Sequence, residues 1–378
     1  MSMIHFLPVR YGDSFVIECD KGNNHGLVVV DGGPNGCGDV LKGKLYELGR
    51  TPDLMVLTHY DDDHIGGLIQ YIRDCTEDGI LPAKEIWANC ATYVDTMNVE
   101  EEKQGPDYYD IVDENGNPQR IYITRSARQA VRLARLVDYF AVNDQLVWRD
   151  NLIEGTGKQF PFATIEVVSP TARGRQLAIG KQEIAAAKMK AKASGVMGGE
   201  ITMEMPTPEV ILPLEELAKD NPKPPSEKAD AEVANAASIA FILRCESLSV
   251  LMLGDCYPHN VVAYLRKRGY SESKPLVVDY VKISHHGSMH NTSNELLDLI
   301  KCNHYIISTN GDKFGHPDRE VFAHILCHPR RNRAEKVHFY FNTDIPSLLK
   351  KSGRFLVGGE MQRYNFEAHQ NVTVLLGL

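Results

Sequence analysis

Four apolar segments of the sequence each end in an aspartate or a histidine, and this repeated pattern constrains the fold more than any other feature. The clearest begins at residue 53 and runs into Thr-His-Tyr-Asp-Asp-Asp-His-Ile-Gly-Gly at 58–67. The other three end at Asp31, at Asp255 and at His285 with His286. Short apolar runs bounded by turn residues are typical of buried strands, so we expect four strand ends to meet at one cleft. Two imidazoles and three carboxylates within six positions of 58–67 predict a metal site there.

The order of predicted elements indicates the fold class. Strands occur in both halves of the chain with helices between them, which predicts two packed sheets covered by helices: an α+β fold with αββα layers. Gly66 and Gly67 are expected to form a tight turn into the next helix. The turn-rich residues 95–122 are expected to leave the core. Residues 172–234, which include several prolines, are expected to form an inserted, partly mobile segment.

Composition narrows the class of protein. With 378 residues, 43% of them hydrophobic, the chain can bury one large core. No run of 18 uncharged apolar residues occurs, so we expect no membrane span. The first residues lack the pattern of a secretory signal, and the eight cysteines lack C-x-x-C spacing, so a cytoplasmic protein with free thiols is expected. The net charge of −9 argues against a basic surface but permits a local basic groove.

Taken together, the motifs resemble the metallo-β-lactamase superfamily, and more closely its branch found in the DNA-uptake competence protein ComEC. The resemblance rests on six motifs in the same order, at 10–14, 31–33, 58–67, 254–255, 282–288 and 315–317. It covers residues 1–95 and 235–320, but neither the insertion nor the residues beyond about 345. It implies a single αββα domain over 1–378 with two divalent metal ions in a cleft at the sheet edge.

The resemblance also implies roles for individual residues. The implied ligands are His59 and Asp61 for one ion, Asp63, His64 and His286 for the other, and Asp255 as the bridge between them. Asp31 is implied to support the site from behind the ligands. Asp63, His285 and His316 are the implied catalytic residues, the two histidines as contacts to phosphate or water, and Ser288 lines the site. We interpret the remaining histidines, among them His304, His338 and His369, as ordinary core or surface residues.

One departure from the superfamily bears on the metal. The superfamily has a histidine in place of Asp61 and a further ligand histidine after the signature. This chain has no histidine between His64 and His259. The third ligand of the first ion is therefore absent, or it comes from Asn89, Cys90 or water. Carboxylate-rich sites favour manganese or magnesium, so we expect manganese or zinc.

A cleft with two metals can hydrolyse many bonds, so the fold alone does not name the substrate. Two features favour phosphodiesters: the resemblance, because members of that branch are linked to DNA degradation, and a predicted helix with four arginines spaced by three, four and three. These are Arg125, Arg128, Arg132 and Arg135. An arginine face suits phosphate contacts, although a solvated face explains the same spacing.

The leading prediction is a metal-dependent phosphodiesterase that acts on nucleic acid or nucleotides through a metal-bound hydroxide. A small-molecule hydrolase, such as a phosphocholine esterase or a lactonase, and a non-catalytic metal-binding module remain alternatives. The oligomeric state is left open.

Overall fold

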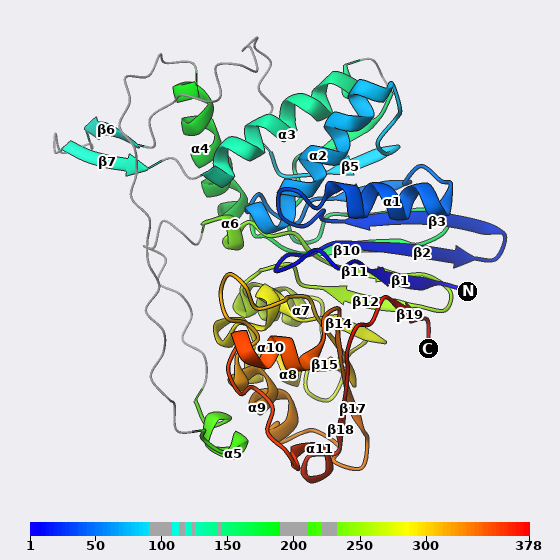
Figure 1. Cartoon of the computed structure of the whole chain (residues 1–378), viewed down its shortest axis with the longest axis vertical. Coiled ribbons are helices and arrows are strands. Elements are labelled where there is room, and N and C mark those ends of the chain that lie inside the picture. Colours follow the sequence, from blue (N-terminus) through cyan, green and yellow to red (C-terminus); the bar gives the residue numbers. More distant parts are fainter. Residues whose placement is uncertain (91–107, 113–117, 123–124, 143–144, 190–210, 221–232) are drawn as a thin grey trace.

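The computed structural model describes residues 1–90, 108–112, 118–122, 125–142, 145–189, 211–220 and 233–378. Two β-sheets face each other, and helices cover the outer side of each sheet (Figure 1). The predicted αββα order of layers is therefore confirmed. The last strand, Val374–Leu376, pairs with the first strand, Met3–Phe6, so the two ends of the chain lie side by side.

The first sheet has seven strands in the order β19-β1-β2-β3-β4-β5-β8. Their bounds are β1 Met3–Phe6, β2 Phe15–Lys21, β3 Asn24–Val30, β4 Leu54–Val56, β5 Glu85–Trp87, β8 Val147–Arg149 and β19 Val374–Leu376. Strands β1 to β3 are antiparallel neighbours, whereas β3, β4, β5 and β8 run parallel. Because β3 and β4 are parallel neighbours, their carboxyl ends lie at the same edge of the sheet. The motifs at Asp31 and at 58–67, which follow these two strands, predict this arrangement.

The second sheet has eight strands in the order β18-β17-β16-β14-β12-β11-β10-β9. Their bounds are β9 Gly157–Gln159, β10 Thr164–Ser169, β11 Ala240–Arg244, β12 Ser249–Met252, β14 Tyr280–Lys282, β16 His304–Ile307, β17 Val337–Phe341 and β18 Phe366–His369. The strands from β12 to β18 are parallel. Strands β17 and β18 extend the sheet beyond the part that the motifs identify.

Two groups of helices complete the layers (Figure 1). On the first sheet lie α1 Gly38–Leu48, α2 Asp62–Asp78, α3 Arg125–Ala141, α4 Ala172–Met189 and α6 Val233–Ala236. On the second lie α5 Leu214–Leu217, α7 Pro258–Lys267, α8 Asn294–Asp298, α9 Arg319–Cys327, α10 Ile345–Lys351 and α11 Glu360–Arg363. Two short pairs, β6 Tyr108–Val112 with β7 Pro118–Tyr122 and β13 Leu276–Val277 with β15 Ile300–Lys301, stand apart from the main sheets.

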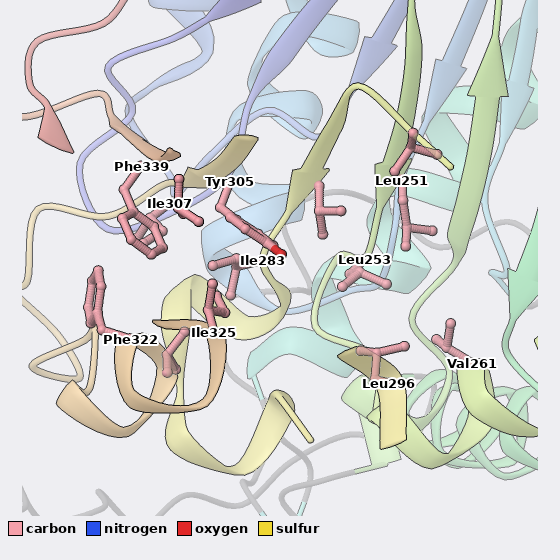
Figure 2. Packing of buried hydrophobic residues seen from close by; sticks show 14 of the residues in the cluster. Leu251, Leu253, Val261, Ile283, Leu296, Tyr305, Ile307, Phe322, Ile325 and Phe339 are labelled. Atoms are coloured by element: carbon pink, nitrogen blue, oxygen red, sulfur yellow. The ribbon is translucent and has the colours of Figure 1, made fainter. Parts of the chain in front are cut away.

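Apolar side chains fill each gap between layers. Alternate residues of β3 show the rule: Val28 and Val30 point between the sheets, whereas Leu27 and Val29 point toward the helices on the first sheet. Figure 2 shows part of the gap between the second sheet and the helices that cover it. Its labelled residues are Leu251, Leu253, Val261, Ile283, Leu296, Tyr305, Ile307, Phe322, Ile325 and Phe339. Among the described residues, no helix has the length and apolar character to span a bilayer.

Both connecting segments contain regular structure. Residues 172–189, which belong to the expected insertion, form α4, which packs on α3 and buries Ala178 in the core. The proline-rich stretch contains α5, whose Leu214 is buried against α9. The excursion at 95–122 contains the hairpin β6–β7. The other parts of both segments, residues 91–107, 113–117, 190–210 and 221–232, lie outside the described residues.

Candidate metal centre

Strand ends position the six predicted metal ligands, which we call the candidate metal centre: His59, Asp61, Asp63, His64, Asp255 and His286. His59 follows β4, Asp255 follows β12, and His286 follows β14 in a short 3-10 turn over Ser284–Gly287. Helix α2 begins at Asp62, so Asp63 and His64 lie in its first turn and Asp61 is its N-cap residue. Carboxylates are favoured there because the N-terminus of a helix carries partial positive charge.

The paired glycines after the motif do not form the predicted turn. Gly66 and Gly67 lie inside α2, where the loop that carries Asp31 crosses the helix closely. A Cβ at Gly67 would lie 1.9 Å from the carbonyl oxygen of Gly32, and one at Gly66 would lie 2.2 Å from the backbone nitrogen of Asn35. Glycine is therefore required by the close approach of two backbones, which brings Asp31 against His64.

Three of the six side chains, those of His59, His64 and His286, converge on one carboxylate oxygen of Asp255. The Oδ2 atom of Asp255 lies 3.4 Å from Nε2 of His64 and 3.7 Å from Nε2 of both His59 and His286. On the two sides of this oxygen, Nε2 of His59 is 3.6 Å from Oδ2 of Asp61, and Nε2 of His286 is 3.4 Å from Oδ2 of Asp63. The structure thus brings together all six predicted ligands, with Asp255 between the two groups.

The buried atoms that face this space lack hydrogen-bond partners. They are Nε2 of His59, His64 and His286. Buried polar atoms normally have partners, because losing water without replacement is unfavourable. Imidazole and carboxylate groups facing one another at these separations are the donor set that a divalent cation requires. The residues present therefore fit the implied metals.

Each ligand imidazole is oriented by its other nitrogen. Nδ1 of His64 lies 2.8 Å from Oδ2 of Asp31, and Nδ1 of His286 donates to the carbonyl oxygen of Ser308 at 2.7 Å. Nδ1 of His59 is 3.1 Å from the hydroxyl of Thr58. Such contacts fix the ring and direct Nε2 toward the metal. Asp31 also accepts two hydrogen bonds from Thr58, so it lies behind the ligands, as the sequence predicts.

The backbone of the centre is strained at three residues. Asp31 has a φ of 58°, His285 of 51° and His286 of 55°, in the left-handed region that side-chain-bearing residues rarely adopt. Strain of this kind persists only where surrounding contacts over-determine the conformation, and it is concentrated at functional sites. Here it turns the chain sharply enough to direct both histidines toward Asp255.

The sequence analysis assigned no role to Asp13 or Lys282, although both lie in its motifs. Lys282 is fully buried, forms an ion pair with Asp13, and donates to the carbonyl oxygen of Gly254 at 3.1 Å. Its Nζ lies 3.8 Å from Oδ1 of Asp255. Asp13 in turn lies 3.4 Å from Nδ1 of His286. A lysine on a buried strand three residues before the paired histidines was the signal that could have identified this pair.

Charge compensation shifts the pKa values throughout the centre. Burial alone would raise the pKa of Asp13, but the charges of Lys282 and His286 outweigh it and lower the pKa to about 2. Burial would lower the pKa of His286, but Asp255 and Asp13 raise it to about 9. The pKa of His64 is raised in the same way, against burial, by Asp255 and Asp31. Metal binding displaces protons of this kind, because ligands must be deprotonated.

His285 and His316 lie at the edge of the centre. Nε2 of His285 is 3.8 Å from Oδ2 of Asp255, and its Nδ1 is held by the side chain of Asn291 at 3.2 Å. Its side chain is 24% exposed, so it connects the buried ligands to solvent. His316 packs edge-on against it, with ring centroids 5.4 Å apart. Ser288 is buried and bonds through its backbone to the His285 carbonyl oxygen.

Asn89, Cys90 and water are the proposed sources of a third ligand for the first ion, and the structure shows the surroundings of the two side chains. Asn89 lines a small cavity with His59, but its amide both donates to and accepts from the backbone of Leu152. Cys90 lines the same small cavity as His59. Burial raises the pKa of its thiol to about 12. Cys90 and water remain the alternatives.

The arginine helix α3 contacts the helix that carries part of the centre. Gln129 of α3 donates to Asp62, in the first turn of α2, at 2.6 Å. Arg128, Arg132 and Arg135 are half-buried, so each keeps part of its surface in solvent. The side chain of Arg125 lies outside the described residues. Whether this face binds phosphate stays a prediction.

An αββα sandwich with histidine and carboxylate ligands at its strand ends defines a class of metal-binding fold. Comparison with family models agrees: residues 7–115 match the metallo-beta-lactamase superfamily. This part of the chain is therefore similar to a superfamily whose members are mostly metallo-hydrolases. No curated protein matches the sequence.

Three solved structures are similar to this chain at low identity. A mutant of CmlA beta-hydroxylase shares 10% identity over 100% of this chain and 54% of its own, with a TM-score of 0.39, so this chain spans about half its length. A diphosphatase from the PhnP family shares 13% over 81% and 85%, with a TM-score of 0.35. A protein of unknown function from Enterococcus faecalis shares 9% over 98% and 77%, with a TM-score of 0.26. Similarity at this level supports no conclusion about activity.

Proposed function

We propose that this protein is a metal-dependent phosphodiesterase of the ComEC-like branch, acting on nucleic acid or nucleotides. The observation that carries the proposal is the convergence of the unpartnered Nε2 atoms of His59, His64 and His286 on Asp255. Manganese or zinc ions bound there would supply the Lewis acidity that phosphodiester hydrolysis requires.

The residues of the candidate metal centre and its surroundings have different proposed roles. His59 with Asp61 would hold one cation, His64 with Asp63 and His286 would hold the other, and Asp255 would contribute to both. Lys282 and Asp13 keep Asp255 and His286 in place from behind. His285, partly exposed and held by Asn291, is placed to hydrogen-bond a phosphate oxygen, with His316 packed against it.

Two features favour phosphodiesters over other esters. The first is the set of six motifs shared with a branch linked to DNA degradation. The second is α3, whose Gln129 bonds to the first turn of α2 and so brings the half-buried Arg128 and Arg132 to the same side of the fold as the centre. Guanidinium groups bind phosphate oxygens with two parallel hydrogen bonds.

A single panel of substrates tests the proposal. Single-stranded DNA, RNA, cyclic nucleotides, a chromogenic phosphodiester, a phosphocholine ester and a lactone are incubated with protein purified without a histidine tag and reconstituted with manganese or zinc. We expect hydrolysis of phosphodiesters, lost in the Asp63→Ala/His64→Ala variant. Asp62→Asn is the matched control, because Asp62 carries the same charge in the same turn but contacts α3 instead of the centre.

Each other outcome identifies an alternative. Hydrolysis of the lactone or the phosphocholine ester alone would contradict the proposal and support a small-molecule hydrolase. Stoichiometric metal binding without hydrolysis of any substrate would support a binding module. Equal activity in the Asp63→Ala/His64→Ala variant would show that the reaction occurs elsewhere in the preparation.

A further inference from the structure

A second group of potential metal ligands lies on the extension of the eight-stranded sheet formed by β16, β17 and β18. We call His338, Glu367 and His369 the β17–β18 cluster. It lies toward the amino end of β16, where His304 neighbours His338, whereas the candidate metal centre contacts Ser308 beyond the other end of that strand. Four residues of a strand span about 13 Å, so the two groups are separate.

The register of three parallel strands brings these side chains to one face. His304, His338 and Glu367 are neighbours across β16, β17 and β18, and Tyr340 is the neighbour of His369. Side chains alternate along a strand, so Phe339 points into the core while His338 and Tyr340 share the opposite, half-buried face. The cluster is therefore a product of strand pairing.

The donor atoms have the spacing of a coordination polyhedron. Nδ1 of His338 lies 3.0 Å from Nε2 of His369, and Oε2 of Glu367 lies 3.6 Å from the first and 3.7 Å from the second. Around a tetrahedral zinc ion with bonds of 2.0–2.1 Å, ligand atoms are about 3.3 Å apart. The measured separations of 3.0, 3.6 and 3.7 Å differ from this ligand–ligand distance by less than 0.5 Å, so small movements of the side chains would let one ion contact all three atoms.

Neighbouring rings hold the two imidazoles in place. The ring of His338 stacks on His304 at 4.8 Å between centroids, and the ring of His369 stacks on Tyr340 at 4.7 Å. His304 and Tyr340 are themselves joined by a 2.9 Å hydrogen bond. Lys336 occupies the other carboxylate oxygen of Glu367 and leaves Oε2 directed at the histidines. Ligands held in this way lose little conformational entropy on binding a metal.

We propose that the β17–β18 cluster binds a divalent transition metal ion of the zinc class, independently of the candidate metal centre. Two imidazoles and one carboxylate are ligands that zinc accepts. The fourth position faces solvent, because Glu367 and His369 are 45% and 36% exposed. Since β18 is the edge strand of its sheet, the ion would clamp this edge strand to β17.

The test counts zinc in protein purified without a histidine tag. Metal-stripped Asp63→Ala/His64→Ala protein, which lacks two ligands of the candidate metal centre, is titrated with zinc against a chromophoric chelator. We expect the number of bound equivalents to fall by one when His338→Asn and His369→Asn are added. His25→Asn is the matched control, because His25 is an exposed histidine that also contacts a carboxylate, that of Asp20, and its replacement should leave the equivalent in place.

A second variant and a second readout guard against misfolding. Glu367→Gln keeps both histidines and the size of the side chain, and it should weaken zinc binding at least roughly tenfold. Zinc should also slow hydrogen exchange of the β17 and β18 amides in the Asp63→Ala/His64→Ala background, and not when His338 and His369 are replaced. An unchanged zinc equivalent in the His338→Asn/His369→Asn protein, or none in its parent, would overturn the proposal. Either result leaves the proposed function untouched, because the two sites share no residue.

Discussion

Replacing Lys282 by methionine tests the central electrostatic feature of the fold. Lys282 is fully buried, yet its pKa is raised: burial favours the neutral amine, but the carboxylates of Asp13 and Asp255 outweigh it. The lysine is therefore charged at neutral pH. Methionine has a similar length and no charge, so Lys282→Met leaves Asp13 and Asp255 without their compensating cation and the Gly254 carbonyl oxygen without its 3.1 Å donor.

The expected loss follows from this geometry. Removing one partner of a buried ion pair reduces the free energy of unfolding by about 3–5 kcal/mol, because the remaining charge stays out of water. Removing both partners is milder, so Asp13→Asn/Lys282→Met should lose less than Lys282→Met alone. The difference between the double variant and the two single variants measures the coupling of the pair.

Urea unfolding of metal-free protein, followed by circular dichroism, gives these free energies if the slope with denaturant is unchanged. Lys84→Met is the matched control: Lys84 pairs with Asp53 at 2.7 Å but is 65% exposed. An exposed pair contributes less than about 1 kcal/mol. If Lys282→Met were no more destabilising than Lys84→Met, the buried lysine would not be compensating the carboxylates, and our account of the charge balance would be wrong.

Three further predictions address other parts of the centre. Asp255→Asn should reduce both the bound metal, measured by elemental analysis, and any hydrolysis by at least roughly a hundredfold, because both groups of ligands share this carboxylate. Asp13 has a folded pKa of about 2, below its ordinary 3.8, so its contribution to stability is present above that ordinary value and is lost as the pH falls toward 2. Unfolding of metal-free protein at about pH 5 and about pH 3 should therefore differ less in Asp13→Asn than in the parent chain. Gly67→Ala should destabilise by about 1–3 kcal/mol in thermal or urea unfolding, because its Cβ would meet the Gly32 carbonyl, whereas Gly43→Ala, in open space on α1, should be neutral or stabilising.

Much of the layered architecture was predictable because it depends on local patterns. Alternating and continuous apolar runs identify strands β1 to β5, β10 to β12, β14 and β16, since a strand must bury at least one face. The packing of residues 172–189 was not predictable because their alanines and lysines lack a clear apolar stripe; contact with α3, from elsewhere in the chain, makes the helix part of the outer layer. The paired glycines at 66–67 were assigned to a turn for a similar reason, because the backbone that approaches them comes from residues 32–35.

By itself, the sequence determined which residues could bind metal, because Asp or His after an apolar strand is a local pattern. Only the tertiary structure decided which atoms face one another. It placed Lys282 and Asp13 behind the ligands, engaged Asn89 with Leu152, and left Cys90 beside His59. It also brought Glu367 beside His338 and His369, two histidines that the sequence alone indicates to be ordinary core or surface residues. The reason is physical: ligand chemistry belongs to a side chain, whereas coordination depends on separations of a few ångströms between strands that are distant in sequence.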